Sequence, residues 1–214
     1  YATHLREDVK KATGVELTNE EANFLGSMTG KVLVEVLPAA VLLMRSLTGI
    51  VSKVVTQTNE PFVFTTATGS VFEAAKYKTK MSKDLGRRCG FNVFIKTDTD
   101  RINVKATAKS AAAQFIQSFD AVIAGEIQQQ MADRGIPVLS VFDSWAVPVG
   151  YSDVLVDVSR DAYIKHLSGN PLQSFYDEAL ARYPLLQKHP NLFLKQGDYR
   201  VEDELPKCKH FIGL

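Results

Sequence analysis

A long amphipathic segment followed at once by two short apolar runs constrains this chain most strongly. Residues 107–134 carry apolar side chains at the spacing of one helix face, and Gly135 is suited to end that helix. The runs "IPVLSVF" and "WAVPV" then predict two short strands around Asp143 and Ser144. The helical stripe consists of Ile116, Phe119, Ile123 and Ile127.

The residues before this feature predict two helices and a small β element. Thr18 and Glu21 have the spacing of a capping box, and the helix they open is expected to kink or end near Pro38. A second apolar helix follows. Residues 61–77 predict a strand pair with a turn at Thr68-Gly69, and residues 91–104 predict further strand with "DTD" (98–100) as its turn.

Two helices are expected after the hairpin. Ser152 is suited to cap a helix that runs through Leu167, and Asn170-Pro171 opens another that ends near Tyr183. The last thirty residues look irregular. Helices, a small β element, a long helix, a tight hairpin and two helices predict an α+β fold, because a doubly wound sheet needs strict strand–helix alternation.

Charge and cysteine content narrow the class of protein. The 25 basic and 24 acidic residues nearly cancel, so a nucleic-acid surface would have to come from local clusters. Cys89 and Cys208 match no paired spacing, and the N-terminus is not signal-like, which indicates reduced thiols in an intracellular protein. Charges interrupt the apolar region Val32–Val55, so we expect no membrane span. A chain that starts at Tyr1 is expected to be a fragment, trimmed or processed.

Asp143 stands between apolar runs, and three explanations of its place are open. Leu139, Val141 and Asp143 are expected on one face of the strand, which puts the aspartate at the edge of an apolar face. An unpaired carboxylate there is costly unless it reaches solvent at the turn, pairs with a base or binds a metal. The pattern alone favours a plain turn aspartate, because Asp and Ser bond the local backbone in turns.

Several segments, in the same order, resemble the C-terminal part of single-subunit RNA polymerases of the phage and mitochondrial type. Those enzymes carry a helix of the form P-N-F-[VI]-H-S-x-D-[AG] and then a hairpin H-D-S-[FW]. Here the helix reads "AQFIQSFDA" (113–121) and the hairpin reads "FDSW" (142–145), with a similar gap between them. The segments "MTGKVLVEV" (28–36), "FTTATGSVFEAAKY" (64–77) and "HFIGL" (210–214) also resemble family segments, so the resemblance covers nearly the whole chain.

The resemblance implies a polymerase right-hand fold. Residues 1–110 would be the C-terminal part of the mostly helical fingers subdomain. Residues 111–214 would be the C-terminal part of the palm, with residues 136–149 as the catalytic hairpin of motif C.

The same resemblance implies a DNA-directed RNA polymerase that adds rNTPs to the 3′-OH of nascent RNA on a DNA template. In the family, the hairpin aspartate, here Asp143, is one of two that bind catalytic Mg²⁺. The other aspartate and the NTP-binding lysine precede the fingers tyrosine, which matches Tyr1. We therefore expect both from an upstream segment or a separate subunit, and no activity from this chain alone.

Tyr1 is accordingly a candidate nucleotide-binding residue, with a tyrosine on a frayed terminus as the alternative. Among the positions that depart from the family pattern, Gln117 and Phe142 replace histidines, and Gln114 replaces an asparagine. Gln117 can still donate and accept hydrogen bonds in a minor groove. Because Asp143 and Ser144 remain, we favour a divergent phage-like branch over a decayed site.

Basic side chains near the expected hairpin and long helix are candidates for contacts with template or RNA. These are Lys76, Lys78, Lys105 and Lys109, together with Gln117 and Ser144. A solvated surface explains the lysines equally well. For Asp120, a solvated or capping role is favoured over metal binding.

Two rival interpretations stay open. The chain could be a non-catalytic nucleic-acid-binding or assembly subunit of polymerase fold, or a fragment of a family-A-like DNA polymerase. The preferred hypothesis is one part of a single-subunit RNA polymerase, which includes the case of one half of a split heterodimeric phage enzyme. It implies an intracellular protein, in the host cytoplasm if phage-encoded and otherwise in the mitochondrion.

Overall fold

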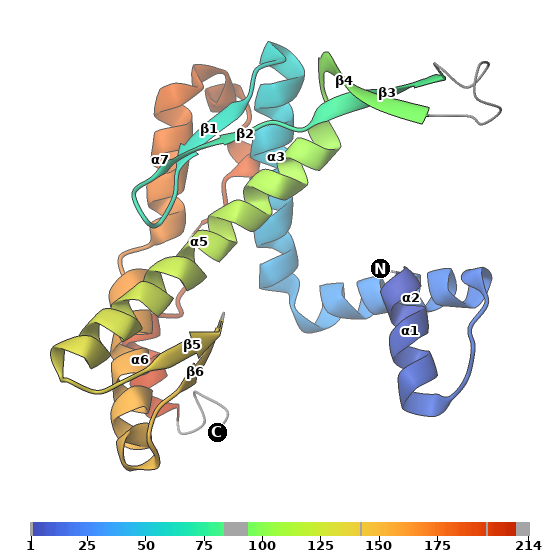
Figure 1. The fold of residues 1–214 in the computed structure, drawn as a ribbon. Coiled ribbons are helices and arrows are strands. Elements are labelled where there is room, and N and C mark those ends of the chain that lie inside the picture. The colour runs from blue at the N-terminus through green and yellow to red at the C-terminus, as the bar shows by residue number, and fades with distance from the viewer. Residues whose placement is uncertain (1, 84–93, 142, 196, 209–214) are drawn as a thin grey trace. The chain divides into compact units, whose positions relative to one another are not determined.

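The structure is a computed structural model that describes residues 2–83, 94–141, 143–195 and 197–208. It contains two compact units, Tyr1–Ser46 and Leu47–Leu214. Helices predominate, and the strands of the described residues form three separate two-stranded antiparallel sheets (Figure 1). This composition agrees with the predicted α+β class.

The first unit confirms the predicted capping box and helix break. The backbone N–H of Glu21 donates to Thr18 Oγ1 at 3.3 Å, and the N–H of Thr18 donates to Glu21 Oε2 at 2.8 Å. The helix α2 (Asn19–Val36) ends just before Pro38, because proline has no N–H with which to continue the helical hydrogen bonds. The elements that begin here are α1 (Ala2–Thr13), α2 (Asn19–Val36) and α3 (Pro38–Thr58).

By length and composition alone, α3 is long and apolar enough to cross a membrane. Its C-terminal half, however, lies in the second unit, where Leu47, Ile50 and Val54 are fully buried. A Cβ added at Gly49 would lie 2.9 Å from Leu192 Cδ2, so the helix packs closely against the segment that holds Leu192. This half of α3 is a core helix of the second unit.

The predicted strand pair with a turn at Thr68-Gly69 is confirmed. Gly69 takes a φ of +80°, a conformation that suits glycine because it has no Cβ. The carboxylate of Glu178 accepts the backbone N–H of Thr65 at 3.0 Å and fastens the first strand to α7. The elements joined here are β1 (Phe62–Thr65), β2 (Val71–Ala74) and α7 (Pro171–Arg182).

Aromatic rings form the core beneath this hairpin. Phe64 is 2% exposed, and its ring centroid lies 5.5 Å from that of Phe72, 6.2 Å from that of Phe115 and 5.8 Å from that of Phe175. These rings come from β1, β2, α7 and the long helix α5 (Val104–Asp133). One cluster therefore joins segments that are far apart in the sequence.

The prediction of a turn at "DTD" is wrong. These residues lie inside β4 (Phe94–Ile102), which pairs with β3 (Tyr77–Lys83) so that Asp98 stands opposite Thr79. The two-stranded ribbon of β3 and β4 is exposed along most of its described length, so neither strand needs an apolar face. A run of polar residues can therefore lie within a strand of this ribbon and does not indicate a turn. Tyr77 and Met81 are 43% and 58% exposed.

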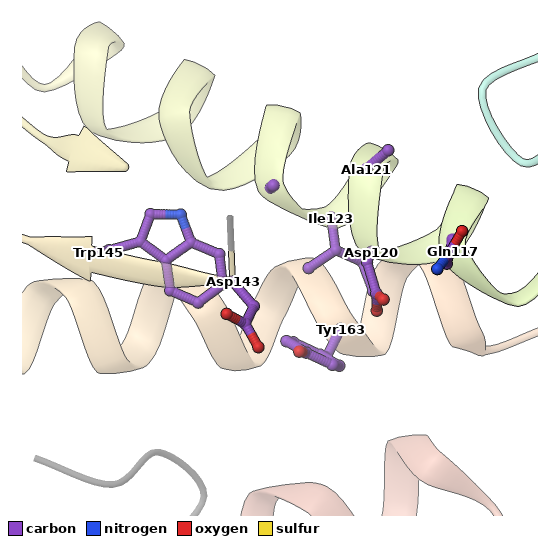
Figure 2. A pocket seen from close by; sticks show the side chains of 8 residues that line it. Gln117, Asp120, Ala121, Ile123, Asp143, Trp145 and Tyr163 are labelled. Atoms are coloured by element: carbon purple, nitrogen blue, oxygen red, sulfur yellow. The ribbon is translucent and has the colours of Figure 1, made fainter. Parts of the chain in front are cut away.

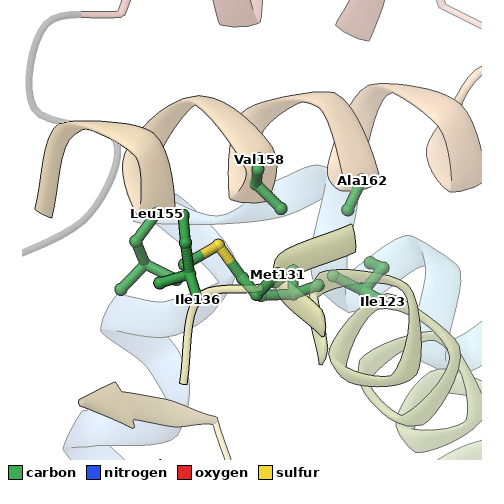
Figure 3. Close-up of a cluster of buried hydrophobic side chains, with 7 residues drawn as sticks. Ile123, Met131, Ile136, Leu155, Val158 and Ala162 are labelled. Carbon is green, nitrogen blue, oxygen red and sulfur yellow. The ribbon is translucent and has the colours of Figure 1, made fainter. Parts of the chain in front are cut away.

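The long helix and its packing partner form a second core (Figure 3). The predicted helix begins slightly earlier than expected, because Asn103 caps it through a 3.2 Å bond from the N–H of Ala106. Gly135 follows its end with a φ of +68°, as predicted. The buried residues are Ile123, Ile127, Met131 and Ile136, which pack on Leu155, Val158 and Ala162. The two helices are α5 (Val104–Asp133) and α6 (Ser152–Leu167).

Both predicted helices after the hairpin are present, but Ser152 does not cap the first. Its hydroxyl instead donates to the carbonyl of Val149 at 2.9 Å, and Tyr151 precedes the helix. Asn170 caps α7, as predicted, through a 3.1 Å bond from the N–H of Gln173. The remaining short helices are η1 (Val149–Tyr151), η2 (Pro184–Lys188), η3 (Pro190–Leu192), α8 (Val201–Glu204) and η4 (Leu205–Lys207).

An acidic side chain fastens α5 to α6. The Nζ of Lys165 and the Nε2 of Gln130 donate to the carboxylate of Glu126 at 2.8 and 2.9 Å, and His166 Nε2 lies 3.5 Å from it. The hydrogen bonds from Lys165 and then from Gln130 lower the pKa of Glu126 from 4.5 to about 2.

Glu126→Gln is expected to lower the free energy of unfolding by about 1 kcal/mol at pH 7. Because the pKa of Glu126 is lowered on folding, its contribution is present above pH 4.5 and is lost as the pH falls toward 2. Urea unfolding at pH 7 and pH 2.5 measures the difference. Glu204→Gln, which removes the exposed ion pair with Lys207, is the control and should change little. A difference for Glu126→Gln that stays constant with pH would contradict this account.

Candidate active site between the long helix and the hairpin

A hollow of about 420 Å³ lies between α5, α6 and the hairpin of β5 (Leu139–Val141) and β6 (Ser144–Ala146). Its lining includes Gln117, Asp120, Asp143, Trp145 and Tyr163. A second hollow, near the end of α5, has no ionisable side chain in its described lining. The first hollow is therefore the better candidate for chemistry.

One face of α5 supplies the helical side of the hollow. Gln117, Asp120 and Ala124 recur at intervals of three and four residues, so they lie on the same side of the helix. Ile123, one turn beyond Asp120, is buried against α6 and fixes the rotation of α5. The segment that resembles the family helix thus turns Gln117 and Asp120 toward the hairpin.

The hairpin register places Asp143 at the other side of the hollow. Val141 pairs with Ser144 and Ser140 pairs with Trp145, so Asp143 lies in the short connection between the strands, as predicted. The Nε2 of Gln128 donates to Ser140 Oγ at 2.7 Å and ties β5 to α5. The helix and the hairpin, separate in the sequence, are held together here.

The expectation that Asp143 borders a buried apolar face is wrong. Leu139 and Val141 are 68% and 59% exposed, and Asp143 is exposed as well. The covered face of the hairpin is the one with Ser140 and Trp145, since Trp145 packs on the core between α5 and α6. Burial therefore puts no large cost on Asp143, and solvent at the turn accounts for its charge without a metal. The case for a site depends on the shared hollow.

Tyr163 of α6 lies between the two carboxylates of the hollow. Figure 2 shows the side chains of Asp120 and Asp143 directed toward its ring from opposite sides. Burial, and then the negative charges of Asp120 and Asp143, raise the pKa of the Tyr163 hydroxyl. Both carboxylates therefore act on one phenol. Asp120 is exposed, as the predicted solvated role requires, but it also shares this hollow.

A buried serine joins two of the family-like segments. Ser118, in "AQFIQSFDA", is 4% exposed and accepts the backbone N–H of Ala67 at 3.0 Å. Ala67 belongs to the turn of "FTTATGSVFEAAKY". The same hydroxyl donates to the carbonyl of Phe115 at 2.7 Å. Ser118 thus has a structural role that positions the β1–β2 turn against α5.

Lys76, Lys105 and Lys109 gather near the start of α5. The backbone N–H of Lys76 donates to Thr107 Oγ1 at 2.9 Å, and the N–H of Asn103 donates to the carbonyl of Lys76. Lys105 and Lys109 follow one turn apart on the helix. All three side chains are exposed, as is that of Lys78 on β3.

Other predicted site residues are not brought to the hollow. Ser144 begins β6 and is exposed, but it is not among the described lining residues. Tyr1, Phe142 and the segment 210–214 lie outside the described residues. So does Cys89, while Cys208 is a free, exposed thiol.

Sequence reasoning missed Tyr163 and Trp145. A signal for Tyr163 was its place directly after Ala162, at the edge of the apolar stripe of α6 that packs on α5. Trp145 could have been found from the hairpin register, since it alternates with Ser144 and Ala146 and faces the core. Tyr163 lies outside the quoted motif segments, whereas Trp145 closes the hairpin motif "FDSW" (142–145).

The donor chemistry of the hollow fits a divalent cation. Asp120 and Asp143 offer exposed carboxylate oxygens, the ligands that Mg²⁺ prefers, and Mg²⁺ usually takes only one or two protein carboxylates. Within the described part of the chain, no group of three or more His, Cys, Asp or Glu side chains gathers. A complete cage for the ion is therefore not formed by the described residues alone.

The fold and site define an α+β protein with an acidic hollow between a long helix and a tight hairpin. The family model for DNA-dependent RNA polymerase matches residues 2–205, so the chain belongs to that family, of the single-subunit phage and mitochondrial type. No curated protein matches the sequence of this chain. Membership supports the broad function of a DNA-directed RNA polymerase, a nucleotidyltransferase of transcription that binds DNA template, RNA and NTPs.

Proposed function

We propose that this chain supplies the Asp143 side of the polymerising centre of a single-subunit RNA polymerase. The observation that carries the proposal is that α5 and the hairpin bring Gln117, Asp120 and Asp143 to one hollow in a member of this family. Family membership supports the type of reaction, and the shared hollow supports this part of the chain as the place where it takes part.

In the proposed reaction, the 3′-oxygen of the RNA attacks the α-phosphorus of an rNTP, and pyrophosphate leaves. Asp143 would hold Mg²⁺ through its exposed carboxylate. When bound, divalent cations steady the charge of the attacking and leaving oxygens. Asp143 alone cannot hold two ions, so the second aspartate and the NTP-binding lysine would come from an upstream segment or a partner subunit. The chain by itself would then be inactive.

In this proposal residues 1–110 belong to the fingers and residues 111–214 to the palm. The nucleic acid would contact the surface of α5. Gln117, on the hollow side of the helix, can donate and accept hydrogen bonds at a minor groove. Lys105 and Gln117 lie about 18 Å apart along the axis, at a rise of about 1.5 Å per residue, which matches about five nucleotides of one strand. Ser144 and Tyr1 stay candidates for contacts with RNA and nucleotide.

Lys105→Ala is expected to weaken template binding at every sequence and to reduce the slope of log affinity against log salt by about 1. The reason is that a lysine on a phosphate releases a counterion when it binds. Fluorescence anisotropy of a labelled template across a salt series measures both quantities. Lys188→Ala, an exposed lysine in η2, is the control. An unchanged slope for Lys105→Ala would assign Lys105 to the solvated surface.

Two other functions make different predictions. A non-catalytic binding subunit of polymerase fold would tolerate the loss of the Asp143 charge, and a DNA polymerase fragment would support dNTP rather than rNTP incorporation. The place of Asp143 in one hollow with Gln117 and Asp120 supports catalysis. A divergent phage enzyme, split or continuous, fits this proposal. It would act in the host cytoplasm, whereas a mitochondrial member would act in that organelle.

The experiment that tests the proposal removes only the negative charge of Asp143. Asp143→Asn is placed in the polymerase assembled with its remaining catalytic parts, and RNA synthesis is measured with rNTPs and with dNTPs. Loss of rNTP incorporation supports the proposal. Unchanged incorporation assigns the chain to the binding class.

A further inference from the structure

Tyr163 is the phenol that the hollow places between two carboxylates. It is half-buried on α6, while Asp120 and Asp143 reach it from α5 and from the hairpin (Figure 2). The charges of both carboxylates affect its hydroxyl. The short motif segments quoted for the family do not include Tyr163.

The backbone that carries Tyr163 is held firmly. Its neighbour Ala162 is fully buried in the core between α5 and α6, and Lys165, half a turn further, forms the 2.8 Å ion pair with Glu126 of α5. Asp143, in contrast, lies in the short connection of a hairpin with three-residue strands and is exposed. Tyr163 thus lies on a well-packed helix, and Asp143 lies in an exposed turn.

The chemistry of the two groups is complementary. An ionised carboxylate only accepts hydrogen bonds, whereas a phenol is neutral at neutral pH and donates one. A hydrogen-bond donor that holds one oxygen of a carboxylate leaves the other oxygen free for a cation. It also reduces the number of side-chain rotamers of the carboxylate that cation binding must restrict. Side chains that orient a metal ligand in this way affect the affinity for the metal strongly.

We propose that Tyr163 is a positioning residue that orients the Asp143 carboxylate for a divalent cation. The proposal rests on the proposed function, because it takes Asp143 as the cation ligand. Tyr163 itself neither reacts nor binds substrate in this account. Its loss should raise the cation concentration that the site needs, by about 10-fold, and leave the rate at saturating cation within about twofold.

The Trp145 side chain can serve as a spectroscopic probe of cation binding in the hollow. It is the single tryptophan of the chain and lines the same hollow as Asp143 and Tyr163. Paramagnetic Mn²⁺ bound at Asp143 should broaden the NMR signal of the Trp145 indole N–H. The full chain is titrated with Mn²⁺, and the midpoint of broadening is compared among wild type, Tyr163→Phe, Tyr199→Phe and Asp143→Asn. Tyr199, 67% exposed, is the matched control for the loss of one hydroxyl.

The expected result is a midpoint about 10-fold higher for Tyr163→Phe, a midpoint within twofold of wild type for Tyr199→Phe, and the weakest broadening for Asp143→Asn. The assembled polymerase gives a second reading. Tyr163→Phe should shift the Mg²⁺ dependence of RNA synthesis by a similar factor, whereas a merely structural role would lower the rate at every Mg²⁺ concentration. Unfolding curves of the variants check that each chain is folded.

Two outcomes overturn the inference in distinguishable ways. If Asp143→Asn weakens broadening but Tyr163→Phe stays within twofold of wild type, the positioning role is wrong and the proposed function stands. If neither variant changes the midpoint, Asp143 is not the cation ligand, and the proposed function fails together with the inference.

Discussion

Asp143→Asn in the assembled polymerase is expected to reduce RNA synthesis by about 1000-fold, or about 4 kcal/mol of transition-state stabilisation. Asparagine keeps the size of the side chain and removes its charge, and a neutral amide oxygen holds Mg²⁺ poorly in an exposed site. Because Asp143 is exposed in the short connection of the hairpin, the substitution should not disturb the core. Run-off transcription on a defined template measures the loss.

Controls separate chemistry from folding and binding for this variant. Asp177→Asn, an exposed aspartate on α7 that accepts from Gln173 at 2.8 Å, should leave RNA synthesis within twofold of wild type. The affinity of Asp143→Asn for template should also stay near the wild-type value, because Asp143 carries no positive charge for the phosphates. A comparable loss in Asp177→Asn would mean that any removed charge is harmful, and Asp143 would lose its special role.

Phe64→Ala is expected to lower the free energy of unfolding of the second unit by about 3–5 kcal/mol. Phe64 is 2% exposed and its ring contacts the rings of Phe62, Phe72, Phe115 and Phe175. Truncation removes buried apolar surface and leaves a cavity between β1, α5 and α7, which the surrounding helices fill only in part. Chemical denaturation followed by circular dichroism measures the change.

Phe24→Ala is the matched control for the stability prediction. Phe24 on α2 is 65% exposed, and its truncation should change the free energy of unfolding by only about 0.5 kcal/mol. A loss below about 1 kcal/mol for Phe64→Ala would contradict the aromatic core described above.

Local signals made much of the fold predictable. Thr18, Glu21 and Asn170 mark helix starts because their side chains accept hydrogen bonds from backbone N–H groups that are unpaired there. Pro171 suits the first helical position because it has no N–H to leave unpaired. Gly69 and Gly135 mark turns and helix ends because they accept positive φ. Of the predicted apolar stripe on α5, Ile123 and Ile127 are buried, whereas Ile116 is exposed. Each of these signals acts within a few residues of the chain.

Long-range packing was less predictable. Alternation of apolar and polar residues could not predict β3, or that "DTD" lies within a strand, because the β3–β4 ribbon is exposed along most of its described length. The exposure of Leu139 and Val141 depends on which hairpin face meets the core, and Trp145 decides that. Tyr163 enters the hollow only through the packing of α6 on α5, which no motif spacing encodes. The family resemblance predicted Asp143 as a site residue. The separate expectation that Asp143 stands at the edge of a buried apolar face was wrong.

The most direct test of the central claim is the single-turnover rate of one rNMP addition to a preformed primer–template. The assembled enzyme is compared with its Asp143→Asn form under conditions in which both are saturated with nucleic acid. A rate slower by about three orders of magnitude, with the template bound equally well, is what a cation-holding carboxylate at the hairpin requires. Equal rates in the two enzymes would show that catalysis does not need this carboxylate, and the proposed site would be wrong.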